Sequence, residues 1–105
     1  MWIFLNNAFL SIVEEPGKLD TLLVRARKRG DLERTFPGTP VEETPSRDYR
    51  FRARIDRERV AAALADAVRS IRYSNFKDSV PEYLRRSAYH SVWDVMLEYQ
   101  RDAQS

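Results

Sequence analysis

The sequence predicts an α+β domain with two layers, in which a four-stranded, mainly antiparallel sheet carries helices on one face. Three observations support this prediction. Short apolar segments separated by turn residues fill the first part of the chain, two segments alternate arginine with apolar residues, and apolar stripes of helical period fill the last part. The expected order of elements is β-β-β-α-β-α-α, and a ferredoxin-like arrangement or a variant of it is the preferred architecture.

The N-terminal segment predicts a β-hairpin followed by a third strand. Met1 to Leu5 and Phe9 to Glu14 are apolar, and Asn6-Asn7 between them tolerates the left-handed conformations of a tight turn. Glu15-Pro16-Gly17 is a second turn signal. The third strand is expected from Asp20 to Lys28, where apolar residues alternate with arginine in Val24-Arg25-Ala26-Arg27.

A short helix, a loop and a fourth strand are expected next. The helix runs from Leu32 to Phe36, with Asp31 near its N-terminus. Residues 37–46 are rich in proline and predict a loop that is the most mobile part of the chain. The fourth strand is expected from Tyr49 to Ile55.

The C-terminal half predicts helices. Asp56 can cap a helix from about Arg57 to Ile71, whose apolar residues form one stripe. Tyr73 to Val80 is expected to be irregular, with its aromatic rings anchored in the core. Two further helical pieces are expected, one from Pro81 to Arg86 and one from Ser87 or Ala88 to about Arg101. The apolar stripe of the last piece consists of Ala88, Val92, Val95, Met96 and Tyr99, with Trp93 on its edge.

Length and composition favour one globular domain over residues 1–105. Hydrophobic residues make up 43% and charged residues 32% of the chain, which is heavily charged for a folded domain. The chain has no cysteine, which excludes disulfides and thiolate metal sites. The apolar N-terminus is too short to cross a bilayer and lacks a basic segment before it, so we expect no membrane association and a location in the bacterial cytoplasm.

The alternating arginines are the main candidate for function. Successive side chains of a strand point to opposite faces, so Val24, Ala26, Phe51, Ala53 and Ile55 can face the helices while the arginines face outward. On the first strand, either Met1, Ile3 and Leu5 or Trp2 and Phe4 share the outward face. If Trp2 and Phe4 do so, rings and guanidinium planes together form a surface on which unpaired bases can stack. The candidate partner-binding residues are Trp2, Phe4, Arg25, Arg27, Arg50, Arg52 and Arg54.

Three interpretations of that face remain open. The arginines can solvate the sheet and form ion pairs with Asp48, Asp56, Glu14 or Glu33, which contribute little stability. The face can instead stack on a protein, including a second copy of this chain, or it can bind nucleic acid. The chain lacks the Lys/Arg-Gly-Phe-Gly-Phe pattern of RNA-recognition domains, so any likeness to them concerns surface chemistry alone.

No residue pattern predicts catalysis, a metal site or a cofactor. His90 is the only histidine, and with Asp94 it forms an i, i+4 pair typical of a solvated helix surface. Asn6 and Asn7 stand where small ferredoxin-like nucleases carry a metal-binding aspartate, and an asparagine supplies no charge for a hard cation.

Five short segments resemble a group of small bacterial and phage proteins to which no activity is assigned. They are Met1 to Phe4, Val24 to Arg27, Asp48 to Phe51, Tyr73 to Lys77 and Val92 to Met96. The resemblance implies a stand-alone domain with an accessory, regulatory or defence-related role. The sequence therefore predicts a non-enzymatic interaction module, acting as a homodimer or an adaptor. The alternative is a nucleic-acid-binding protein that uses the arginine-rich face of its sheet.

Overall fold

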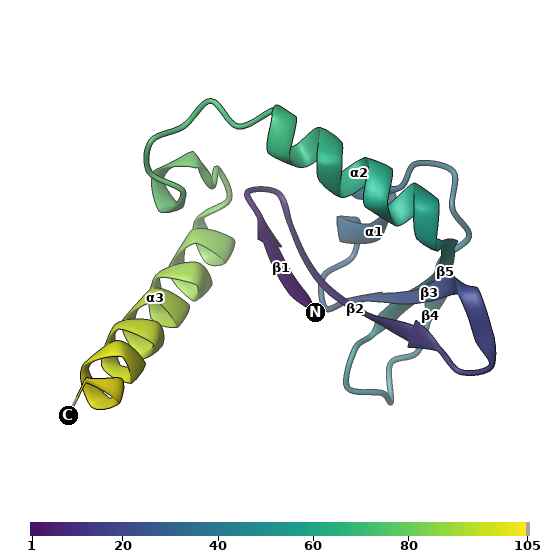
Figure 1. The fold of residues 1–105 in the computed structure, drawn as a ribbon, viewed down its shortest axis with the longest axis horizontal. Helices are drawn as coiled ribbons and strands as arrows, with labels where there is room; N and C mark the ends of the chain where they lie inside the picture. The colour runs from purple at the N-terminus through teal and green to yellow at the C-terminus, as the bar shows by residue number, and fades with distance from the viewer. Residues whose placement is uncertain (105) are drawn as a thin grey trace. The chain divides into compact units, whose positions relative to one another are not determined.

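The computed structural model describes residues 1–104, which form two compact units divided between Arg72 and Tyr73. Residues 1–72 carry an open, five-stranded antiparallel sheet with two α-helices, and the remainder carries one long α-helix (Figure 1). The predicted α+β class is therefore confirmed. The expectation of one domain across the chain stays a prediction.

The sheet has the strand order β1-β2-β3-β5-β4, and every neighbouring pair is antiparallel. Its strands are β1 (Trp2–Leu5), β2 (Ala8–Glu15), β3 (Lys18–Ala26), β4 (Glu42–Glu43) and β5 (Phe51–Asp56). The predicted count of four strands is wrong, because β4 forms inside the proline-rich segment 37–46. With only two residues, β4 is too short to show the period-2 pattern by which strands are recognised in a sequence. The ferredoxin-like arrangement is not confirmed.

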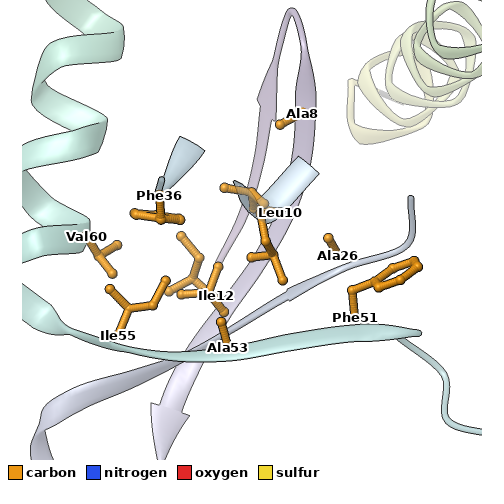
Figure 2. Close-up of a cluster of buried hydrophobic side chains, with 11 residues drawn as sticks. Ala8, Leu10, Ile12, Ala26, Phe36, Phe51, Ala53, Ile55 and Val60 are labelled. Carbon is orange, nitrogen blue, oxygen red and sulfur yellow. The ribbon is translucent and has the colours of Figure 1, made fainter. Parts of the chain in front are cut away.

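Helices α1 (Asp31–Thr35) and α2 (Arg57–Arg69) pack on one face of this sheet. Leu32 and Phe36 from the α1 segment and Val60 from α2 meet the apolar side chains of β2, β3 and β5, as Figure 2 shows for Phe36 and Val60. The strand residues of this core are Ala8, Leu10, Ile12, Val24, Ala26, Phe51, Ala53 and Ile55. The helix-facing set predicted from the alternation therefore lies in the core.

A buried carboxylate joins α1 to β2. Asp31 is 1% exposed, and its Oδ2 accepts a hydrogen bond from the backbone N–H of Phe9 at 3.1 Å. Its other oxygen, Oδ1, pairs with the guanidinium of Arg34 at 2.5 Å. Gly30 precedes the helix with φ +95°, a conformation that glycine adopts without the steric cost of a side chain. The negative charge at the start of α1 is thus used to position the helix.

The second unit consists of the short 3₁₀ helix η1 (Lys77–Ser79) and the long helix α3 (Tyr83–Ala103). The prediction of two separate helical pieces is wrong, because α3 continues through Ser87. Glu82 caps α3 by accepting a hydrogen bond from the backbone N–H of Arg85. Serine has only a modest helix cost, so it does not end a helix that is capped and packed elsewhere.

Aromatic contacts hold the segment before α3 against that helix. The ring of Phe76 stacks on Tyr89 with 5.6 Å between centroids and also meets Tyr73 at 5.8 Å. The ammonium of Lys77 lies 4.3 Å from the ring centroid of Trp93. This segment therefore packs against α3 through its aromatic side chains. Anchoring of these rings in the core is not confirmed, because Tyr73 is 37% exposed and neither Tyr73 nor Phe76 belongs to the core cluster.

Candidate binding face on the open side of the sheet

The strand register places aromatic and cationic side chains together on the sheet face opposite α1 and α2, which we call the outer face. Trp2 pairs with Ser11, Ser11 with Arg25, and Arg25 with Arg52, so these four residues form one row across four strands. Directly paired residues of an antiparallel sheet point to the same side. Arg54 lies on this side too, opposite Leu23.

Arg27 and Arg50 lie at the margin of the outer face, beyond the ends of their strands. The expected strands Asp20–Lys28 and Tyr49–Ile55 are too long at this end, because β3 stops at Ala26 and β5 starts at Phe51. Arg27 Nη1 lies 3.3 Å from Asp48 Oδ1, and Arg50 Nη2 lies 2.8 Å from Glu43 Oε2. Both arginines therefore form exposed ion pairs, which contribute little stability.

Three rings on β1 and β2 form an aromatic cluster at one side of the outer face. Trp2 lies edge-on to Phe9 with 6.2 Å between centroids, and Phe4 lies 4.7 Å from Phe9. Trp2 is 67% exposed, so much of the indole is available to a partner. Phe9 was not among the residues predicted for this face, although the alternation along β2 places it opposite Phe4.

Tyr49 lies against the guanidinium groups of Arg25 in β3 and of Arg27 just after it. Its ring is buried, and the guanidinium carbons of Arg25 and Arg27 lie 4.6 and 4.1 Å from its centroid. Arg25 Nη2 also donates a hydrogen bond to Ser11 Oγ at 2.8 Å. The Nε atom of Arg25 is buried and has no hydrogen-bond partner. Arg25 is thus held in place by neutral groups and pairs with no acid in the described chain.

Arg52 and Arg54 have opposite electrostatic surroundings although they lie two positions apart on β5. Arg54 pairs with Glu15 at 3.1 Å and Glu42 at 3.3 Å, and these hydrogen bonds raise the pKa of its guanidinium. Arg52 forms no ion pair within residues 1–104, and its Nε is buried without a partner. Burial, followed by repulsion from Arg47 and Arg25, lowers the pKa of Arg52.

Arg25 and Arg52 lie opposite each other, and Arg47 repels Arg52, so we call these three residues the unpaired arginine cluster. Arg47 lies in the loop before β5, where no sequence pattern predicts a role for it, and it makes no side-chain hydrogen bond or ion pair to residues 1–104. Ion pairing thus accounts for Arg27, Arg50 and Arg54 but leaves the centre of the outer face positively charged.

Residues 1–104 contain no group of three or more histidine, aspartate or glutamate side chains that could hold a metal ion. His90 Nε2 lies 3.7 Å from Asp94 Oδ2 on the surface of α3, and the imidazole stacks on Trp93. Within the same residues, no helix is long and apolar enough to cross a membrane.

Comparison with known proteins returns no match to a family model, to a curated protein or to a solved structure. The resemblance to small bacterial and phage proteins therefore stays a prediction. The outer face is the feature of this chain from which a function can be inferred.

Proposed function

We propose that this protein is a non-enzymatic binding module whose outer face takes single-stranded nucleic acid. The observation that carries the proposal is the row Trp2, Ser11, Arg25 and Arg52, which joins an exposed indole to cations without acid partners. Both helices of residues 1–72 pack on the other side of the sheet. The row therefore lies on the face opposite these helices, where Trp2 is exposed and Ser11 beside it is buried.

Two interactions with an unpaired strand follow from this arrangement. A base can stack on Trp2, and such stacking contributes roughly 1–3 kcal/mol per base with little dependence on sequence. The unpaired arginine cluster can contact the phosphates, because guanidinium groups bind phosphate through paired hydrogen bonds. Double-stranded DNA suits the face less well, since its bases are stacked within the helix and cannot reach the indole.

The test is a titration of the full chain with fluorescently labelled single-stranded DNA and RNA, followed by anisotropy. Three phosphate contacts predict a log–log salt dependence with a slope of roughly −2, from about −0.7 per neutralised phosphate. Trp2→Ala should weaken binding by about 5- to 150-fold, which corresponds to the loss of one stacked base. Absence of binding at low salt would overturn the proposal.

Arg69→Gln is the matched control for charge. Arg69 lies on α2, is exposed, and pairs only weakly with Asp66 at 3.7 Å. The variant that tests the cluster is Arg52→Gln, which removes a positive charge from the outer face. Arg69→Gln removes an equal charge but leaves the outer face intact. If both variants reduced binding equally, the effect would be one of net charge, and the outer face would not be the binding surface.

Self-association is a second candidate function, favoured by one observation. Helix α3 exposes an apolar stripe in which Leu84 is 72%, Val95 62% and Tyr99 64% exposed. Such a stripe on a helix surface is typical of a packing face. Sedimentation equilibrium should then give a mass that rises with concentration and returns to the monomer mass in Val95→Glu. A strict monomer throughout the concentration range would exclude it.

A further inference from the structure

The centre of the outer face carries positive charge that the described chain does not balance. Arg25 and Arg52 lie directly opposite each other on β3 and β5, and like charges in that position destabilise a sheet. Arg47 adds a third guanidinium close enough to lower the pKa of Arg52 by repulsion. Glu42 attracts Arg52 and opposes part of this repulsion, but its carboxylate is paired with Arg54 at 3.3 Å. An anion from outside the chain would relieve this repulsion.

The free donors of the cluster suit an oxyanion. The Nε atoms of Arg25 and Arg52 are buried and lack an acceptor, and the other nitrogens of Arg52 make no hydrogen bond within residues 1–104. Nε and a neighbouring Nη of one guanidinium form a fork that matches two oxygens of a phosphate.

Arg52 is reached from a shallow hollow at the β4–β5 edge of the sheet. The hollow has a volume of about 320 Å³, enough for a phosphate group. It is lined by Pro40, Val41, Glu42, Arg52, Ala53 and Arg54. The carboxylate of Glu42 in this lining is already paired with Arg54, so Arg52 is the lining cation that needs a counter-ion.

We propose that Arg25, Arg47 and Arg52 bind a phosphate dianion, which in the nucleic-acid complex is the terminal phosphate of the strand. The second part of this inference rests on the proposed function. A terminal phosphate carries a charge of about −1.5 to −2 at pH 7, and it balances three guanidinium groups better than the single charge of an internal phosphodiester. Trp2 lies three strand spacings from Arg52, or roughly 14 Å, which leaves room for bases between the phosphate and the indole.

The phosphate site is tested without nucleic acid. Inorganic phosphate is titrated into ¹⁵N-labelled full-length protein against sodium chloride of equal ionic strength, and the arginine Nε–H signals are followed by NMR. The signals of Arg52 and Arg25 should shift and saturate with phosphate but not with chloride. Arg52→Gln should weaken phosphate binding about tenfold or more, as expected for the loss of a charge-assisted hydrogen-bonded pair. Arg69→Gln should leave it unchanged. The absence of a saturating shift would overturn the phosphate site.

Oligonucleotides that differ only at their ends test whether the bound phosphate is the terminal phosphate of the strand. Strands with a 5′-phosphate, a 3′-phosphate or two hydroxyl ends are compared by competition, and a terminal phosphate should tighten binding about tenfold. Arg52→Gln should remove this advantage, and Arg52→Lys should keep part of it because the charge remains without the fork. Equal binding of all three strands would overturn the terminal-phosphate inference but leave the proposed function standing. Binding of phosphate without binding of any strand would refute the proposed function and leave the phosphate site standing.

Discussion

Replacing Arg52 by glutamine should raise the free energy of unfolding, whereas the same replacement at Arg54 should lower it. Both arginines lie on the outer face of β5, so the two variants remove the same group from almost the same place. Arg54 contacts two carboxylates, at 3.1 and 3.3 Å. Arg52 contacts none and lies opposite Arg25. The folded state therefore stabilises the charge of Arg54 and destabilises the charge of Arg52.

The pKa directions agree with this contrast. The pKa of Arg52 is lowered by burial and by its arginine neighbours, so the folded state disfavours its charge at every pH below that pKa, which includes neutral pH. The pKa of Arg54 is raised by Glu15 and Glu42. Its stabilising contribution is complete below the unfolded pKa and is lost only as the pH rises through the folded pKa. Both effects are thus present in full near pH 7.

The expected magnitudes follow from the contacts. Removing Arg52 relieves a like-charge pair, at about 0.2–1 kcal/mol, and an unsatisfied buried donor, at about 1–3 kcal/mol. Loss of packing by the aliphatic stem offsets part of this gain, which leaves a net stabilisation of about 1 kcal/mol. The ion pairs of Arg54 are half exposed and screened by solvent, so their loss should cost about 0.5–1 kcal/mol in total.

The assay is urea unfolding of the three proteins, followed by circular dichroism at low and high salt. In the absence of phosphate, the two variants should differ by about 1.5–2 kcal/mol at low salt, a gap of several degrees in Tm for a domain of this size. The gap should narrow at high salt because the charges are screened. If Arg52→Gln were destabilised as much as Arg54→Gln at low salt, the inference of an uncompensated charge at Arg52 would be wrong.

Three other predictions concern the core and the ion pairs. Asp31→Ala should lower the free energy of unfolding by about 1–3 kcal/mol, because the Phe9 N–H loses its acceptor; thermal unfolding that matches wild type would contradict this role. Phe36→Ala should cost about 3–5 kcal/mol through the cavity it leaves, measured by urea unfolding, and a loss below 1 kcal/mol would mean that the side chain is not in a packed core. The hydrogen bond from Arg50 lowers the pKa of Glu43 from 4.5, so the stabilisation by ionised Glu43 is present above pH 4.5 and is lost as the pH falls through the folded pKa. In unfolding experiments at decreasing pH, Glu43→Gln should therefore lose less stability than the wild-type protein.

Which side chains of a strand face the helices could be predicted from the sequence, because a wrong register would bury charged side chains and expose apolar ones. A shift of one residue in β5 would bury Arg52 and Arg54 under the helices and expose Phe51 and Ile55. Only one register avoids that cost, and the alternation in the sequence shows it directly. The same logic does not apply to β4, whose two residues are exposed and are held by pairing with β5 rather than by an apolar face.

The centre of the candidate site could be predicted only in part. Trp2, Arg25 and Arg52 share a row because the turns between the strands set the pairing, and the sequence indicated this as one of two options. The positions of Arg47 and Tyr49 depend instead on a loop that has no periodic pattern. That loop is closed by Thr44, whose N–H donates to the carbonyl of Arg50 at 2.6 Å.

The arrangement of acids on the outer face argues for recognition of one anion rather than for simple solvation. A face built only for solubility gains most when acidic and basic side chains alternate, because every charge then has a partner. Here Asp48 and Glu43 pair with Arg27 and Arg50 at the margin, and Glu15 and Glu42 pair with Arg54. Arg25 and Arg52, which lie opposite each other, form no ion pair within residues 1–104. A positive centre within a paired margin concentrates the attraction at one point, and buried donors without acceptors add a preference for an oxyanion over chloride. Because this centre should lower the stability of the sheet, the gain in stability of Arg52→Gln and its loss of phosphate binding are expected to appear together in one protein.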